Sequence, residues 1–261
     1  MDKKLLLNIV EDRYRKFQND YAVVSTDFLD LNEQSLVMPF VKSHAKEGVF
    51  LYGGFEDAER KQVVFVPDYT MICGEEELFY YFKENPEQCP LRVIDVVAGK
   101  KDASLRHSDY LGALMSLGVK REKMGDILVL EEGAQIVVNE EIASYLAQNY
   151  VAVGKTPIST QVLTVDKLKK SSVKKERQKF TVASPRLDNI VSAAFGISRK
   201  TAVEAVSRGI VFVNSIETKK PDYMLKGGEK VVLRGKGKVV YRGATGTSRK
   251  GKAYVELDKY L

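Results

Sequence analysis

The sequence contains few of the residues on which stabilised or reactive sites are usually built. Among 261 residues there are two cysteines, Cys73 and Cys89, and two histidines. Two isolated cysteines are too few for a disulfide framework or a zinc site, so we expect reduced thiols, no metal and no cofactor. No apolar run approaches the roughly 18 residues of a membrane span, and the charged residues 1–4 lead into an amphipathic helix rather than a signal peptide. These absences predict a soluble cytoplasmic protein.

The motifs of common enzyme classes are also missing. There is no P-loop, and Gly99 is the one glycine where a methyl-donor or nucleotide loop would need several. His107 lies beside Arg106 and Asp109 at a predicted helix start, but no cysteine or serine elbow is near it, and Ser108 is available as a helix cap. We therefore predict no catalytic residue and favour a binding protein over an enzyme.

Charge is distributed unevenly along the chain. Residues 171–261 hold 20 Lys and Arg against 8 Asp and Glu, whereas residues 1–170 hold 21 against 27. A basic end joined to an acidic remainder indicates that the C-terminal part binds a polyanion and that the front part could dock a protein partner. Membrane-surface binding is disfavoured, because the basic residues lie among turns and strands rather than on one long amphipathic helix.

The C-terminal part shows a helix–helix–hairpin pattern. Ser184-Pro185 predicts the start of a short amphipathic helix that ends at Gly196. Ser198 predicts the cap of a second helix, which Gly209 closes. The strands of the following hairpin are expected at residues 211–213 and 230–233, with a turn at Asn214-Ser215 and a final strand at 254–257.

Basic side chains gather on this helix pair, a layout suited to docking on RNA. Arg199 and Lys200 open the second helix, where the helix N-terminus itself favours phosphate. They lie off its apolar face, so replacing both with alanine is expected to weaken RNA binding without unfolding the domain. A glycine-rich basic loop is expected at residues 242–252. The predicted RNA-binding residues of this part are Arg186, Arg199, Lys200, Arg208, Arg242 and Lys250.

The order of these features resembles a known RNA-binding domain. Arg186-Leu187-Asp188, Ser198-Arg199, Gly209 and Asn214 are similar, in order and spacing, to the domain named after ribosomal protein S4. Gly228-Glu229 departs mildly from the Gly-Asp usual there. The resemblance covers residues 186–240 and implies that the helix pair and the following loop hold structured RNA, through its shape and phosphates.

The middle part predicts the β-α-β-β-α-β order of ferredoxin-like and RRM folds. The elements are expected at residues 91–97, 107–117, 127–130, 136–138, 140–148 and 150–153. Where an RRM carries stacking rings this chain has Val93, Ile94, Ile136 and Val138, so we expect no base stacking on this sheet.

A basic turn precedes the second of these strands. Lys120, Arg121 and Lys123 are predicted to contact phosphates there, with Gly118 and Gly125 allowing tight turns. The alternative is a solvated charged loop.

A second resemblance lies in this middle part. Residues 106–114 and 117–127 are similar to the central block of the YlmH family, bacterial proteins with an RRM-like region ahead of a C-terminal S4-type domain. The resemblance implies RNA binding, association with the large ribosomal subunit and a part in clearing stalled nascent-chain complexes. The family also occurs among cell-division genes.

Enzymes that carry S4-type domains fit less well. The chain lacks the signatures of tyrosyl-tRNA synthetases, since Lys123-Met124-Gly125 does not supply the Lys-Met-Ser-Lys-Ser motif. Arg186-Leu187-Asp188 also lacks the larger domain that surrounds the catalytic aspartate of pseudouridine synthases. An RNA-modifying enzyme is therefore the less favoured alternative.

Taken together, the patterns predict an α+β protein in three parts. An N-terminal α/β domain is expected over residues 1–87, with helices at 5–20 and 75–82 and strands at 36–41, 49–52 and 63–66. The RRM-like domain is expected over 88–170. A basic connection at 171–179, the S4-like domain and a basic extension complete residues 171–261.

The predicted function is non-catalytic binding of structured ribosomal RNA, tRNA or both, on the large ribosomal subunit. A cell-division scaffold that acts mainly through protein contacts is the other alternative.

Overall fold

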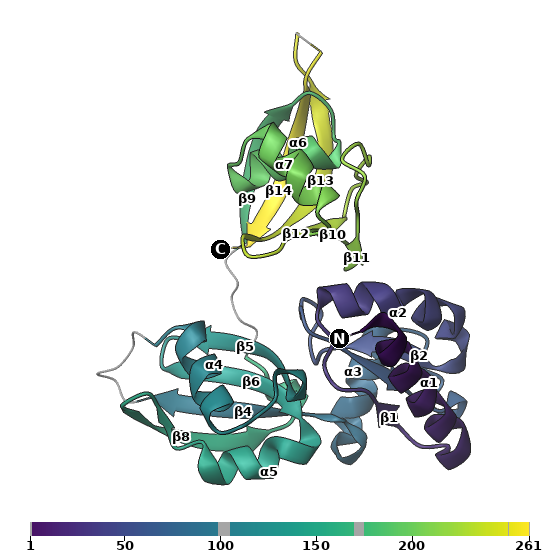
Figure 1. The fold of residues 1–261 in the computed structure, drawn as a ribbon, viewed down its shortest axis with the longest axis vertical. Helices are drawn as coiled ribbons and strands as arrows, with labels where there is room; N and C mark the ends of the chain where they lie inside the picture. The colour runs from purple at the N-terminus through teal and green to yellow at the C-terminus, as the bar shows by residue number, and fades with distance from the viewer. Residues whose placement is uncertain (1, 99–104, 170–174, 250, 261) are drawn as a thin grey trace. The chain divides into compact units, whose positions relative to one another are not determined.

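The computed structural model describes residues 2–98, 105–169, 175–249 and 251–260. The fold is α+β, and the chain divides into two compact units, Met1–Ser171 and Ser172–Leu261 (Figure 1). None of the described helices combines the length and apolar character needed to cross a bilayer. The predicted boundary between an N-terminal domain (1–87) and an RRM-like domain (88–170) stays a prediction, because the segments on either side of it contribute to one hydrophobic core.

The front of the first unit is a small antiparallel sheet with three α-helices. The sheet order is β1-β3-β2. The elements are α1 (Lys3–Asp20), β1 (Val24–Ser25), α2 (Leu31–Ser43), β2 (Val49–Tyr52), β3 (Gln62–Phe65) and α3 (Glu75–Glu84), with short 3-10 turns at Ala45–Glu47, Asp68–Thr70 and Pro86–Gln88.

The strand predicted at residues 36–41 is wrong, because this segment is the second half of α2. The Asp30 carboxylate accepts a hydrogen bond from the Glu33 amide, and the Glu33 carboxylate accepts one from the Asp30 amide, both at 2.9 Å. This reciprocal capping box fixes a helix start six residues before the apolar run that favoured a strand.

The middle of the first unit has the predicted β-α-β-β-α-β order, with sheet order β5-β6-β4-β8-β7 and antiparallel neighbours. Its fourth long strand is β8 rather than the segment predicted at 150–153, where β7 is a two-residue edge strand that turns back at Gly154. The elements are β4 (Leu91–Ala98), α4 (His107–Ser116), η4 (Arg121–Lys123), β5 (Met124–Leu130), β6 (Gly133–Asn139), α5 (Glu140–Asn149), β7 (Ala152–Val153), β8 (Thr156–Leu163) and η5 (Val165–Lys167).

Both faces of this middle sheet contribute to buried cores. Ile94, Ile136 and Val138 belong to the core that includes residues of α4 and α5. Residues of the other face, including Val93 and Val137, belong to a core with aromatic side chains of the front segment and α3. Three rings of that second core, Phe28, Tyr52 and Phe82, are each at most 1% exposed. The front segment therefore packs against the sheet face on which an RRM stacks bases. Of the four positions predicted to replace stacking rings, Val93 lies on this face, whereas Ile94, Ile136 and Val138 lie on the face covered by α4 and α5, so their placement was wrong.

A close packing contact at Gly125 joins the front segment to β5. Gly125 has no positive φ, in contrast to Gly118 at +79°, so the expected tight turn exists at Gly118 and not at Gly125. A Cβ atom at position 125 would lie 2.7 Å from Cε1 of Phe28, which is 1% exposed. The glycine is needed here because the Phe28 ring lies directly on the strand.

Gly125→Ala is expected to lower the unfolding free energy of the first unit by about 1–3 kcal/mol, because a buried ring must move to accommodate the methyl group. Urea denaturation of the full chain measures this. Gly112→Ala is the matched control: this position lies in α4 with open space around a new Cβ, and alanine favours helix. Equal stability of the two variants would contradict the contact.

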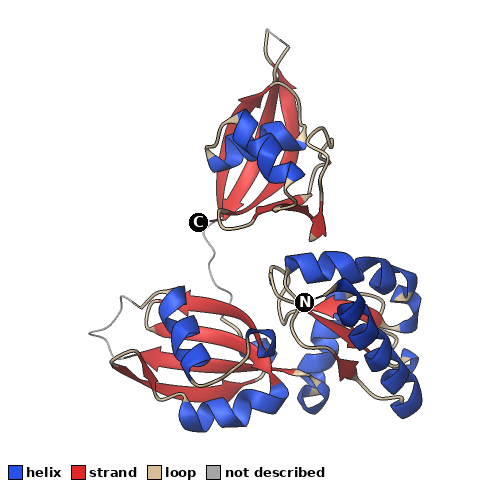
Figure 2. Cartoon of the chain, in the orientation of Figure 1, coloured by secondary structure: helices blue, strands red, loops and turns tan. Residues whose placement is uncertain are grey.

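The second unit is a six-stranded antiparallel sheet with two short helices across one face (Figure 2). The sheet order is β11-β10-β12-β13-β14-β9. The elements are β9 (Lys175–Val182), α6 (Leu187–Phe195), α7 (Arg199–Ser207), β10 (Val211–Val213), β11 (Ile216–Glu217), β12 (Lys230–Leu233), β13 (Gly237–Thr247) and β14 (Ala253–Tyr260).

Two segments predicted as irregular are strands in this unit. The described part of the expected connection at 171–179 belongs to β9, which pairs with β14 along its length. Phe180 and Val182 face the core, whereas residues 175–179 of the same strand are all polar or charged, so the sequence shows little alternation of apolar and polar residues here. The glycine-rich basic loop is also shorter than predicted, because β13 continues to Thr247 with two register shifts in its pairing with β14.

Candidate RNA-binding surfaces

The helix pair of the second unit is fixed by backbone contacts at one helix and a side-chain cap at the other. Ser198 Oγ accepts the Thr201 amide at 3.1 Å and caps α7 as predicted. The predicted cap of α6 at Ser184 is wrong, since α6 begins after Arg186. The first amides of α6 instead donate to the chain: Leu187 to the Tyr223 carbonyl at 2.8 Å and Asp188 to the Pro221 carbonyl at 3.0 Å.

Asp188 is a buried carboxylate held between two arginines. Its side chain is 0% exposed. Arg186 Nε lies 3.1 Å from one carboxylate oxygen, and Arg199 Nη2 lies 3.0 Å from the other. The arginine side chains are themselves 36% and 59% exposed, so the carboxylate positions two guanidinium groups at the surface. We call this arrangement the helix-side clamp.

An open hollow of about 680 Å³ lies at the helix-side clamp. Three predicted RNA-binding residues, Arg186, Arg199 and Lys200, line it, whereas Arg208 is exposed at the other end of α7 and is not among the lining residues. Three carboxylates balance the three cations. The lining residues are Arg186, Asp188, Arg199, Lys200, Val203, Glu204, Pro221 and Asp222.

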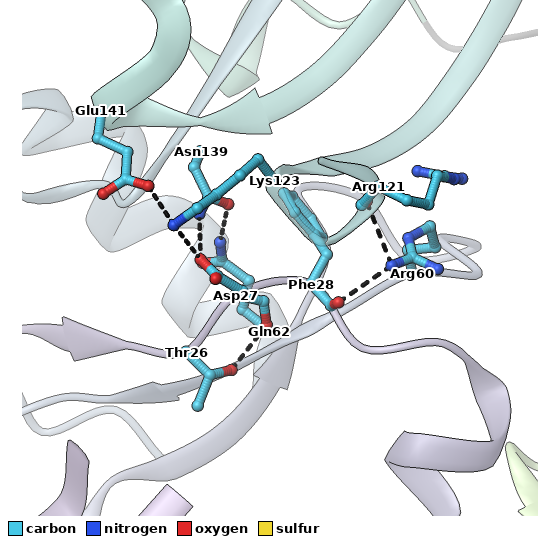
Figure 3. Close-up of polar contacts among 9 residues, drawn as sticks. All are labelled: Thr26, Asp27, Phe28, Arg60, Gln62, Arg121, Lys123, Asn139 and Glu141. Carbon is cyan, nitrogen blue, oxygen red and sulfur yellow. Dashed lines mark hydrogen bonds and ion pairs between the residues drawn. The ribbon is translucent and has the colours of Figure 1, made fainter. Parts of the chain in front are cut away.

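In the first unit, the predicted basic turn is built into the packing between the front segment and β5. The Arg121 guanidinium donates to the Met124 carbonyl at 2.8 Å and the Gly125 carbonyl at 3.0 Å. Burial and, after it, the positive charge of Arg60 lower the pKa of Arg121 to about 10. Arg60 in turn donates to the Phe28 carbonyl at 3.0 Å (Figure 3).

Lys123 is paired with carboxylates inside the same unit. Its ammonium lies 2.8 Å from the Asp27 carboxylate and also pairs with Glu141 (Figure 3). Asn139 Nδ2 donates to Asp27 at 2.7 Å, which links the front segment to the end of β6. Of the three cations predicted to contact phosphate, Lys120 is exposed, while Arg121 and Lys123 are partly buried in these contacts.

The two remaining predicted residues belong to the C-terminal hairpin. Arg242 lies in β13, where its Nε is 2.6 Å from the Asp258 carboxylate. Lys250 lies outside the described residues. The sequence did not lead us to predict that the carboxylates of Asp188 and Asp258 would each pair with two arginines. Asp188 was detectable, because it is a lone acid among the apolar residues that open α6.

The residues weighed as reactive or metal-binding candidates have the following surroundings in the described part of the chain. No three His, Cys, Asp or Glu side chains within the described ranges gather to hold a metal ion. Burial raises the pKa of the Cys89 thiol to about 12, which disfavours the reactive thiolate. His107 is exposed at the start of α4, where the Asp109 carboxylate, rather than the expected Ser108, accepts the Arg106 amide at 2.7 Å.

Comparisons with known proteins agree with both resemblances. Residues 85–180 match a family model described as "Putative RNA-binding domain in YlmH", and residues 185–231 match the S4 domain model. The ribosome-associated protein quality control protein P2 of Bacillus subtilis (strain 168) is 30% identical over 258 residues, covering 99% of this chain and 95% of that protein. The solved cell division protein ylmH from Streptococcus pneumoniae is 22% identical, with a TM-score of 0.46, covering 64% of this chain and 94% of that chain.

Proposed function

Because this chain belongs to the YlmH family of proteins with a C-terminal S4 domain, we propose that it is a non-catalytic factor that binds structured ribosomal RNA. The helix-side clamp is the observation that carries the proposal. A buried carboxylate holds Arg186 and Arg199 with their guanidinium groups at the surface, beside the exposed Lys200. Fixed guanidinium forks match phosphate geometry and lose little conformational freedom on binding.

We further propose that the RNA lies on the large ribosomal subunit and that the protein handles stalled nascent-chain complexes there, with tRNA as a second contact. The relative in Bacillus subtilis is named for ribosome-associated quality control, which supports this direction. The balanced charges of the hollow favour recognition of a particular phosphate arrangement over general attraction to polyanions. In the first unit we assign an RNA contact to Lys120, and we propose that Arg121 and Lys123 mainly hold its turn in shape.

Lys200→Ala is expected to weaken binding to purified large ribosomal particles about three- to tenfold at moderate salt, because one phosphate contact is lost while the Asp188 pairs remain. The slope of log affinity against log salt should fall by about 0.9 for one phosphate contact. Filter binding of the full chain across a salt series measures both quantities. Lys83→Ala is the matched control, since this exposed lysine lies on α3 in the first unit.

Unchanged affinity and slope in folded Lys200→Ala protein would contradict the assignment of this surface. Two other outcomes would overturn the proposed function itself. Failure of the wild-type chain to bind large particles, together with retention of a division protein, would favour a scaffold. A new RNA modification that depends on this protein, detected by mass spectrometry, would favour an enzyme.

A further inference from the structure

A stretch of the sequence that is rich in Lys and Arg and contains no acidic residue lies mostly beyond the S4 match. Residues 230–255 contain eight Lys and Arg and no Asp or Glu, whereas the S4 match ends at residue 231. This segment forms β12, β13, the turn between them and the start of β14. The hollow at the helix-side clamp, in contrast, has equal numbers of cations and carboxylates.

Alternation along β13 assigns part of this charge to the sheet face opposite the helices. Val239 and Tyr241 are 0% and 2% exposed and belong to the core that includes the α6 and α7 residues. Successive strand residues point to opposite faces, so Lys238 and Arg242 project from the other side. We call the face that carries them the outer face.

A second buried carboxylate holds two arginines on this outer face. Asp258 of β14 is 5% exposed and lies between the neighbouring strands β9 and β13. Arg177 Nε lies 2.9 Å from one of its oxygens, and Arg242 Nε lies 2.6 Å from the other. The arginine side chains are 57% and 43% exposed. The arrangement repeats the chemistry of the helix-side clamp, with both guanidinium groups fixed at the surface.

The protonation of Asp258 is consistent with this arrangement. The hydrogen bonds from Arg177 are the largest cause that lowers the pKa of Asp258. The hydrogen bonds from Arg242 and the positive charges of both arginines lower this pKa as well, while burial raises it, and the net result is a pKa below the usual value. The carboxylate therefore stays ionised at neutral pH and keeps both arginines in place.

Aromatic side chains accompany these cations. Tyr254 is 44% exposed, and it alternates with the core residue Val255 on β14. The Lys238 ammonium lies 4.7 Å from the centroid of the Tyr260 ring. The remaining acid on this part of the face, Glu256, is paired with Lys179 at 3.1 Å. Cations and tyrosine rings on one sheet face suit nucleic acid, since rings stack on bases while guanidinium groups bind phosphates.

We infer that the outer face is a second RNA-binding surface, which holds the phosphodiester backbone of a further RNA segment through Arg177, Lys238 and Arg242. This inference rests on the proposed function, and extends it: α6 and α7 would contact one RNA segment, while the opposite face of the same sheet contacts another. An acidic protein segment is the competing occupant. Guanidinium groups bind its carboxylates as well as phosphates, but it lacks the bases on which tyrosine rings of this face can stack.

The test removes outer-face charge in the full-length protein. Lys238→Gln/Arg242→Gln is expected to weaken binding to large ribosomal particles on the order of tenfold, and to lower the salt slope by about two for two lost phosphate contacts. Lys42→Gln/Lys46→Gln removes the same charge from exposed positions in the first unit and should change neither quantity. Because Arg242 holds Asp258, Lys236→Gln/Lys238→Gln provides a second variant that leaves both arginine clamps intact.

The outcomes distinguish a failure of the second RNA-binding surface from a failure of the proposed function. If both outer-face variants fold and bind with unchanged affinity and slope while Lys200→Ala weakens binding, the second surface is overturned and the proposed function stands. If Lys200→Ala is also without effect, the proposed function fails with it. Loss of binding to a labelled polyglutamate peptide, with particle binding unchanged, would assign the outer face to an acidic protein instead.

Discussion

Replacing both Arg186 and Arg199 with alanine is expected to lower the unfolding free energy of the second unit by about 3 kcal/mol or more, because the fully buried Asp188 carboxylate would lose both of its arginine partners. Each arginine singly should cost less, since the other still donates to the carboxylate. Hydrogen exchange of the α6 and α7 amides in the full chain measures this, because it reports local stability within one unit.

A third substitution is expected to restore stability to the arginine double variant. Adding Asp188→Asn to the double variant removes the buried charge, so it should restore a large part of the lost stability. The Lys200→Ala protein is the matched control, because it removes a neighbouring cation that lines the same hollow but does not pair with Asp188 in the structure. Unchanged α6 protection in the arginine double variant would show that the clamp does not stabilise the fold.

The prediction that replacing Arg199 and Lys200 together leaves the domain folded needs refinement, because the structure gives the two residues different contacts. Both were expected to tolerate alanine, because neither lies on the apolar face of α7. Arg199 nevertheless contacts a buried acid of α6 at 3.0 Å. Loss of RNA binding after Arg199→Ala would therefore combine a lost contact with a less stable helix pair, so Lys200 is the cleaner probe of binding.

Capping residues and regularly spaced apolar residues in the sequence predicted those helices and strands in which both features are clear. Gly196 ends α6 in a left-handed conformation, and Ser198 caps α7, as their residue types require. The α+β class and the order of the middle strands followed from similar signals. The strand predicted at 36–41 failed because an apolar run of that length fits either a buried strand or a helix, and the capping box at Asp30 was overlooked.

The candidate surfaces were less predictable, because they depend on contacts between distant residues. Charge and spacing placed Arg121 and Lys123 on a turn, but nothing local indicated that Asp27, 96 residues away from Lys123, would pair with it. The clamp on Asp258 joins β9 to β13 through β14, and it requires the strand order of the sheet. A basic residue in the sequence is therefore a candidate for RNA binding and for structural pairing alike, until its neighbours are known.

Arg121→Glu is expected to lower the unfolding free energy of the first unit by about 2–4 kcal/mol, since a carboxylate would replace a partly buried guanidinium that donates to two carbonyls. Lys120→Glu is the matched control: it makes the same charge change on the adjacent exposed residue and should alter stability by about 0.5 kcal/mol or less. Urea denaturation, followed by amide exchange in β5, measures both variants.

The RNA affinity of this pair of variants then tests the two roles that the basic turn can have. If the turn contacts phosphate, Lys120→Glu should weaken particle binding and reduce its salt dependence while the protein stays folded. If the turn serves only to hold the front segment on β5, Lys120→Glu should bind like the wild type, and any loss in Arg121→Glu should follow the fraction of unfolded protein. A stable Arg121→Glu protein would contradict the structural role, because a carboxylate cannot donate the hydrogen bonds that the Arg121 guanidinium makes to the Met124 and Gly125 carbonyls.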